Sequence, residues 1–170
     1  MAGRMKKIAV LATGGTFDKE YNELSGELYF KQTHLPEMLA LGRARVPVRI
    51  QTLMMKDSLR MTSADRRIIA AACQQARERM VVITHGTDTM EVTAGVLAKK
   101  VSGKTVVLTG AMVPYKFGSS DGLFNLGSAL TLVQVLPAGI YIAMNGRFFT
   151  WDAVTKNRAA GVFEEQPLPV

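Results

Sequence analysis

The chain has 170 residues, 48% of them hydrophobic, which suits one domain, and its apolar runs are well short of the ~20 residues that span a bilayer. One cysteine and two histidines exclude an internal disulfide and a typical zinc site, so we expect a reducing, cytoplasmic location and no metal. The basic residues behind the net charge of +7 are dispersed, mostly where helices would expose a polar face, as with Arg66 and Arg67, which argues against a nucleic-acid partner.

The first half of the chain begins with a basic and then apolar stretch that is too short for a signal peptide, so we predict a strand there. Residues 13–30 are polar, punctuated by glycines and without a sustained period, which predicts a long loop of the kind that forms lids. Thr62 or Ser63 should cap a strongly periodic helix that has Asp65 in its first turn. The other predicted elements are strands at 6–12 and 46–53 and a short helix at 34–41.

The second half alternates strictly between apolar strands and amphipathic helices. Asp121 is a plausible N-cap for the last helix. After a short β segment at 147–151, a tail of about 158–170 carries Pro167 and Pro169. The predicted strands are 81–84, 104–109 and 139–144, and the predicted helices are 89–100 and 121–135.

This alternation predicts an α/β fold, an open, mostly parallel sheet flanked by helices in a Rossmann-like three-layer arrangement, with residues 1–170 as a single domain. In such sheets ligands bind beyond the carboxyl ends of the strands. Four polar segments each follow a predicted strand and should therefore crowd one edge of the sheet. They are residues 13–16, 57–58, 85–89 and 110–121.

Two motif matches at other places in the chain are rejected. Residues 103–105 resemble the end of a phosphate-binding loop, but Ala98 stands where its glycine is required, and the triplet precedes a strand. Residues 118–122 fit the G-x-S-x-G pattern, but that elbow needs a later histidine, and both histidines come earlier.

Two glycine- and hydroxyl-rich segments carry more chemistry. The sequence TGGT at 13–16 is explained equally well as a glycine turn or as a site where backbone N–H groups approach a substrate carbonyl beside the Thr16 hydroxyl. The sequence HGTDTME at 85–91 offers hydroxyls, a carboxylate and a glycine at the end of a strand. Asp88 could cap the following helix, but capping alone does not account for the run, so ligand binding is favoured.

Five ordered blocks of the chain resemble the bacterial-type L-asparaginase family. The blocks run nearly from end to end, and chance does not produce five of them in the right order. They are ATGGTFD (12–18), KDSLRM (56–61), ITHGTDTMEVTA (83–94), TGAMVPYKFGSSDGLFNL (109–126) and WDAVTKN (151–157).

The resemblance implies a role for each matching residue. Thr16 corresponds to the nucleophile and Tyr21 to the lid tyrosine that activates it, with Tyr29 as a rival for that place. The second catalytic set is Thr87, Asp88 and Lys156. The implied substrate-binding residues are Gly15, Ser58, Asp57, Gly86, Thr87 and Asp88, with Ser58 on the α-carboxylate of the substrate, Asp88 on its α-ammonium group and the role of Asp57 open.

These residue types suit hydrolysis of an amide. A threonine hydroxyl is a poor nucleophile near neutral pH, so it needs a base and an oxyanion site. Lys156 accepts a proton only if burial lowers its pKa, which the attraction of Asp88 opposes. Taken alone, Lys156 could equally be a solvent-exposed lysine, Tyr21 a loop aromatic that packs on the sheet edge and Ser58 a turn cap.

The predicted function is hydrolysis of L-asparagine, or a related small amide, to L-aspartate and ammonia without a cofactor. The alternative is a non-catalytic domain of the same fold that binds an amino acid or another small ligand, and a nucleic-acid module is the least favoured hypothesis. The resemblance also implies a homodimer or higher homo-oligomer. It covers only the N-terminal domain of the family, whose members continue into a smaller C-terminal domain that these residues do not contain.

Overall fold

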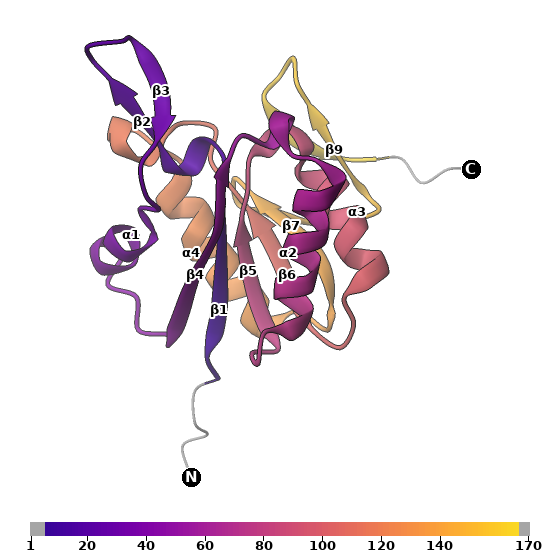
Figure 1. The fold of residues 1–170 in the computed structure, drawn as a ribbon. Helices are drawn as coiled ribbons and strands as arrows, with labels where there is room; N and C mark the ends of the chain where they lie inside the picture. Colours follow the sequence, from indigo (N-terminus) through magenta and orange to yellow (C-terminus); the bar gives the residue numbers. More distant parts are fainter. Residues whose placement is uncertain (1–5, 167–170) are drawn as a thin grey trace.

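The centre of the molecule is a six-stranded sheet in the computed structural model, which describes residues 6–166. The strand order is β4-β1-β5-β6-β7-β8, and all neighbours run parallel except β7 and β8 (Figure 1). The predicted α/β fold with an open, mostly parallel sheet is therefore confirmed. The strands are β1 (Ile8–Gly14), β4 (Val48–Lys56), β5 (Met80–Thr84), β6 (Thr105–Thr109), β7 (Gly139–Met144) and β8 (Arg147–Thr150).

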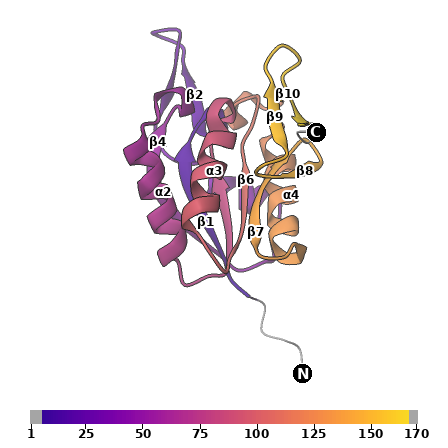
Figure 2. The same ribbon diagram turned by 90° about the vertical axis from the view of Figure 1, so that its right-hand side faces the viewer.

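Helices cover both faces of the sheet and complete the three layers (Figures 1 and 2). Two of them, α2 and α3, pack on one face, and α1 and α4 pack on the other. Within residues 6–166 no helix is both long and apolar enough to cross a membrane. The helices are α1 (Leu35–Leu41), α2 (Ser63–Gln75), α3 (Met90–Lys100) and α4 (Gly122–Val135).

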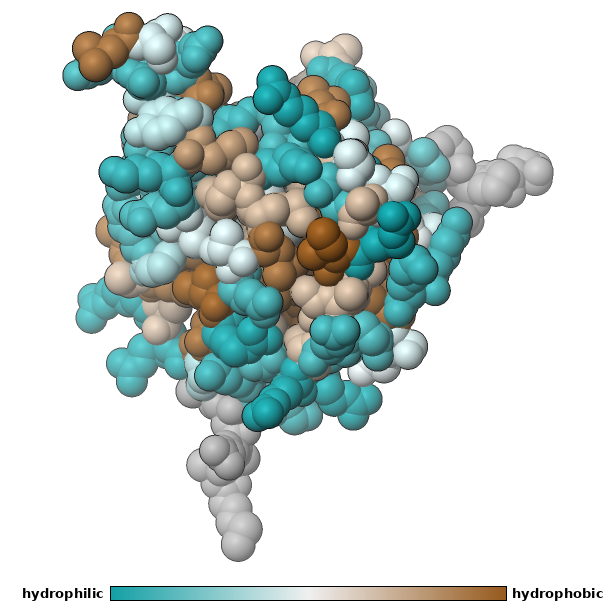
Figure 3. Space-filling view, viewed as in Figure 1, coloured by the Kyte–Doolittle hydropathy of each residue, from teal (hydrophilic) through white to brown (hydrophobic). Residues whose placement is uncertain are grey.

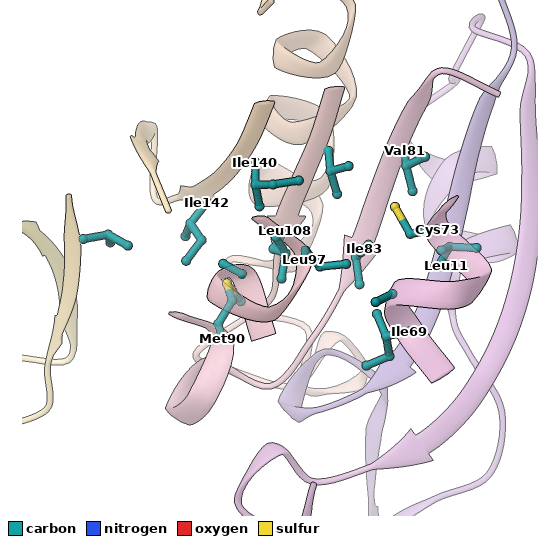
Figure 4. Packing of buried hydrophobic residues seen from close by; sticks show 14 of the residues in the cluster. Leu11, Ile69, Cys73, Val81, Ile83, Met90, Leu97, Leu108, Ile140 and Ile142 are labelled. Atoms are coloured by element: carbon teal, nitrogen blue, oxygen red, sulfur yellow. The ribbon is translucent and has the colours of Figure 1, made fainter. Parts of the chain in front are cut away.

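The core lies on both sides of β1, which is buried along its whole length. Ile8 and Val10 point into the cluster beneath α1 and α4, whereas Ala9 and Leu11 point into the cluster beneath α2 and α3. Burial on both faces is typical of a central strand in a parallel sheet and explains its unbroken apolar run. Figure 4 shows the cluster on the α2 and α3 side, which includes the single cysteine, Cys73.

The first two strands of the sheet extend further than predicted. β1 continues to Gly14 instead of residue 12, and β4 continues to Lys56 instead of residue 53. The two ends pair with each other after a register shift that follows Ala12. Backbone pairing needs no apolar side chain, so the hydropathy pattern could not reveal these last residues.

The segment 13–30, predicted as an irregular loop, contains a short turn and a β-hairpin instead. The 3-10 turn η1 (Thr16–Asp18) leads into β2 (Lys19–Asn22), which pairs antiparallel with β3 (Glu27–Phe30). Because most of the hairpin is exposed, it lacks the alternation that reveals a half-buried strand. The hairpin stands above the carboxyl edge of the sheet (Figure 1), and its tip, where Leu24 is exposed, is brown in Figure 3.

A second hairpin follows β8 and rises above the same edge (Figure 2). It consists of β9 (Val154–Asn157) and β10 (Val162–Glu165). The prediction of a tail over 158–170 is therefore wrong where β10 lies, while Pro167 and Pro169 fall outside the described residues. One apolar side chain from each strand is buried in the core beneath α2 and α3, which anchors the hairpin.

The two long helices begin in different ways. Thr62 caps α2 as predicted, because its hydroxyl accepts the N–H of Asp65 while the Asp65 carboxylate accepts the N–H of Thr62. Asp121 stands before α4, but its carboxylate does not cap the helix. It accepts the N–H groups of Met112 and Val113 in the loop after β6, so its predicted capping role is wrong.

Candidate active site

The candidate site lies at the carboxyl edge of the sheet, between β1 and β5. The strand order reverses here, because β4 lies on one side of β1 and β5 on the other. Such a switch point is where open α/β sheets bind ligands. The four predicted segments follow β1, β4, β5 and β6, and their short turns contact one another across this edge.

Two glycines after β1 allow the neighbouring loops to approach closely. Gly14 and Gly15 have φ angles of +94° and +81°, a region that other residues rarely adopt. A Cβ on Gly14 would collide with the backbone of Lys56, and one on Gly15 would collide with the backbone of Gly86. The turn therefore requires glycine, and it seats Thr16 beside the loop that follows β5.

A third close contact joins the loop after β5 to the loop after β4. A Cβ on Gly86 would lie 2.6 Å from the Cβ and Oγ atoms of Ser58. Ser58 is 1% exposed, and its hydroxyl has no hydrogen-bond partner among residues 6–166. It does not cap the turn that follows, because Asp57 does so by accepting the N–H of Leu59. The Ser58 hydroxyl is thus a buried group without a partner in the described part of the chain, directly beside the loop after β5.

Asp57 has a second partner in the hairpin. Lys19 of β2 donates to its carboxylate at 2.6 Å. Burial alone would raise the pKa of Asp57, but the hydrogen bonds from Lys19 and Leu59 lower it below its ordinary value. The Asp57 carboxylate is already paired, and the pairing ties the hairpin to the loop after β4.

The loop after β5 meets Lys156 of β9. The Lys156 ammonium donates to Thr87 Oγ1 at 2.8 Å and to Asp88 Oδ1 at 2.6 Å. The Lys156 side chain is only 6% exposed, so it is not a solvent-exposed lysine. Asp88 does not cap α3, which begins after the 3-10 turn η3 (Thr87–Thr89), because its carboxylate is used by the lysine. Thr87, Asp88 and Lys156, which the resemblance grouped together, are thus in contact, although Lys156 is 69 positions away from Thr87 in the chain.

Thr16 begins η1 and is partly buried, and the next two side chains, Phe17 and Asp18, anchor the turn in the interior. The two candidate lid tyrosines lie on opposite faces of the hairpin, because Tyr21 pairs with Leu28 whereas Tyr29 pairs with Glu20. Tyr21 is 56% exposed, and its hydroxyl lies near the hairpin turn. The hydroxyl of Tyr29 donates to Glu20.

A buried network behind the site was missed in the sequence. Arg66, expected on a solvent-exposed face of its helix, is only 8% exposed and lies against the loops after β4 and β5. Its hydrogen bonds lead to Thr89, Thr93 and the fully buried His85. One signal was present: Arg66 shares the inner face of α2, at spacings of three, four and seven, with the buried positions 69, 70 and 73.

These parts define an α/β protein with a hydroxyl-rich candidate site at its switch point. The site holds threonine and serine hydroxyls, an ammonium–carboxylate pair and glycine backbones in close contact. Residues 7–165 match the family model described as "Asparaginase, N-terminal". The chain therefore belongs to the asparaginase family, and the match covers the family's N-terminal domain.

Individual relatives agree with this assignment. The chain is 29% identical to the L-asparaginase of Thermococcus kodakarensis over 92% of its own length and 49% of that protein. It is 32% identical to L-asparaginase 1 of Escherichia coli K12 over 96% of its length and 52% of that protein. The chain thus spans about half the length of these relatives.

Solved structures show the same fold. The thermostable L-asparaginase from Thermococcus kodakarensis matches with a TM-score of 0.82 over 96% of this chain and 52% of that one, at 29% identity. A probable cytoplasmic L-asparaginase from Campylobacter jejuni matches with a TM-score of 0.82 over 94% of this chain and 53% of that one, at 27% identity.

Proposed function

We propose that this chain is an asparaginase-like amidohydrolase that uses Thr16 to hydrolyse the side-chain amide of L-asparagine or a related small amide. Family membership and the names of the relatives support this reaction class. The observation that carries the proposal is the buried contact of Lys156 with Thr87 and Asp88, at the switch point beside the loop that bears Thr16.

The reaction proceeds as two acyl transfers. The Thr16 hydroxyl oxygen bonds to the amide carbon and gives its proton to a base. The carbon–nitrogen bond then breaks, and the nitrogen takes up a proton and leaves as ammonia. Water attacks the resulting aspartyl ester, which releases the acid and restores the threonine hydroxyl.

Thr87, Asp88 and Lys156 serve the proton transfers in this proposal. The Lys156 ammonium contacts both the Thr87 hydroxyl and the Asp88 carboxylate, so the three groups form a path along which a proton can pass. In the charged form Lys156 donates to Thr87 Oγ1, which leaves the hydroxyl proton of Thr87 free to point toward the substrate.

Substrate recognition rests on Ser58, Asp88 and the glycine backbones between them. A buried hydroxyl without a hydrogen bond is costly, and the α-carboxylate of an amino acid would supply the partner that Ser58 lacks among residues 6–166. The carboxylate of Asp88 is partly exposed and can meet the α-ammonium group while it holds Lys156. The close backbones of Gly15 and Gly86 form the floor between them. Tyr21 on the hairpin is the lid residue in this scheme, while Asp57 supports the hairpin through Lys19.

Ammonia release from L-asparagine, L-glutamine and small amides tests the proposal. Thr16→Ala should lower the rate by more than about 10³-fold, as loss of a nucleophile does in other hydrolases, while Thr16→Ser should keep part of it. Thr131→Ala, which removes a hydroxyl from α4, is the matched control. Unchanged ammonia release by Thr16→Ala would refute the role of Thr16. Ligand-induced stabilisation without turnover, equal in both proteins, would identify a binding domain instead.

The chain is further proposed to act as one domain in a cytoplasmic homo-oligomer. The structural similarity to a probable cytoplasmic L-asparaginase from Campylobacter jejuni supports the location. The surface of α4 supports the assembly: its fourteen residues include no charged side chain although the chain carries a net charge of +7. Phe124 and Val135 of this helix are exposed, and Phe148 of β8 is exposed as well. Two copies can meet on this face without bringing like charges together.

A further inference from the structure

Arg66 is the centre of a buried hydrogen-bond network behind the candidate site. Its guanidinium donates from Nη1 to the carbonyl of Met61 at 2.8 Å, from Nη2 to Thr89 Oγ1 at 2.9 Å and from Nε to Thr93 Oγ1 at 3.2 Å. A guanidinium has only donors, so the direction of each of these bonds is fixed. The two threonine hydroxyls must accept from Arg66, and their own protons are left for other partners.

The first relay runs through Thr93 to His85. The Nδ1 atom of His85 lies 2.7 Å from the carbonyl of Gly86, which can only accept. Burial lowers the pKa of His85 to about 4, so the ring is neutral and its single proton must be on Nδ1. Nε2 is then an acceptor, and Thr93 donates to it at 2.8 Å. The donor of each hydrogen bond in this series is therefore fixed: Arg66 donates to Thr93, Thr93 to His85, and His85 to the carbonyl of Gly86.

This relay determines the orientation of the peptide group between Gly86 and Thr87. The carbonyl of Gly86 is held by His85, and in a trans peptide the next N–H points the opposite way. The N–H of Thr87 therefore points away from His85. Gly15 lies against the preceding peptide, between His85 and Gly86, and the Cα of Gly86 faces Ser58, so the loop after β5 is packed against both neighbouring loops of the site.

The second relay runs through Thr89 to the loop after β4. Thr89 Oγ1 accepts from Arg66 and donates to the carbonyl of Ser58 at 2.9 Å. The bond from Arg66 to the carbonyl of Met61 holds the other end of the same loop. Arg66 therefore holds the backbone of Ser58, whose buried hydroxyl has no partner among residues 6–166, from behind.

We propose that Arg66 is a positioning residue that acts through these two hydroxyl relays. One relay orients the peptide at 86–87 for the reaction, and the other sets the Ser58 loop for substrate binding. The kinetic consequences rest on the proposed amidohydrolase function, whereas the orientation of the two loops does not. Lysine cannot replace Arg66, because one ammonium on a flexible chain cannot reach the three fixed acceptors at once.

Isosteric variants separate the two relays. Thr93→Val removes the relay to the peptide at 86–87 and should lower kcat by about tenfold or more with a smaller change in KM. Thr89→Val removes the relay to Ser58 and should raise KM by a similar factor with kcat largely retained. Thr93→Ser and Thr89→Ser keep the hydroxyls and should restore both constants. Equal changes of kcat and KM in both valine variants would indicate a general structural effect and would overturn the proposal.

Arg66 itself is tested against its exposed neighbour. Arg66→Met and Arg66→Lys should each combine the two kinetic defects, while Arg67→Met, one position along α2, should resemble the wild type. In backbone NMR spectra Arg66→Met should shift the amide resonances of Ser58 and Thr87, and Arg67→Met should not. If Arg66→Met leaves these resonances and both kinetic constants unchanged, Arg66 has no positioning role.

Histidine NMR provides a readout that does not depend on turnover. The chain has two histidines, so His34→Gln assigns the remaining imidazole to His85. His85 should be neutral at pH 7 with its proton on Nδ1, and its Nε2 resonance should shift in Thr93→Val, where the donor is lost. A proton on Nε2, or a charged ring, would refute the relay. The expected tautomer in a protein without amidase activity would refute the proposed function alone.

Discussion

Lys156 and Asp88 depend on each other at the level of single residues. The Lys156 ammonium is almost fully removed from water, and the Asp88 carboxylate is the one countercharge within hydrogen-bond distance of it among residues 6–166. The pair thus holds the Lys156 ammonium against the Thr87 hydroxyl, which is the contact that the proposed reaction uses.

His85 makes the stability of the fold depend on pH. Burial lowers its pKa to about 4, whereas in the unfolded chain it is about 6.5. As the pH falls from 6.5 towards 4, the unfolded state binds a proton that the folded state does not. The free energy of unfolding should therefore decrease by up to about 1.4 kcal/mol per pH unit in this window and stay level above it.

Urea denaturation at pH 7 and pH 5 measures this effect. His85→Gln should flatten the dependence, because the titrating ring is gone. The ion-paired carboxylates of Asp65 and Glu78 have pKa values of about 2 in the folded chain and ordinary values of 3.8 and 4.5, all below pH 5, so they change the stability little between pH 7 and pH 5. Equal slopes in the wild type and His85→Gln would show that His85 does not resist protonation.

At the scale of single elements, α2 depends on its N-terminal cap. Thr62→Ala would leave the N–H of Asp65 without its partner and should lower the free energy of unfolding by about 1 kcal/mol. Thr62→Ser should keep most of the stability. Ser63→Ala, at the next exposed position, is the control in the same urea experiment, and a loss there as large as in Thr62→Ala would contradict the capping role.

The buried strands were predictable from the sequence, and the two exposed hairpins were not. The strands around Val81 and Val106 lie between two helical layers, so their apolar runs gave their positions. The hairpins β2–β3 and β9–β10 are largely exposed to solvent, so their sequences lack the alternation of apolar and polar residues that reveals a strand. The positions of Thr16 and Thr87 at one edge followed from parallel topology alone. The burial of Lys156 and Arg66 did not, because it depends on segments far away in the chain.

At the scale of the whole molecule, we predict that copies associate through the exposed surface of α4, which has no charged side chain. Phe124→Glu places a charge in the middle of the exposed apolar face, where the wild-type side chain is 62% exposed, and should dissociate a homo-oligomer. Phe117→Glu adds the same charge at an exposed phenylalanine outside α4 and should not dissociate it. Sedimentation velocity over a range of concentrations distinguishes the two. A wild-type chain that sediments as a monomer throughout would contradict the assembly.

The single buried cysteine, Cys73, can report how often the folded core opens. Cys73 has no exposed surface, and burial raises its pKa to about 12, so the thiolate that alkylating reagents attack is scarce while the chain is folded. Reagent can reach the sulfur only when α2 lifts from the sheet or the whole chain opens. The rate of Cys73 alkylation in native buffer therefore measures how often these openings occur. A bound substrate that makes them rarer would slow alkylation without contacting the sulfur.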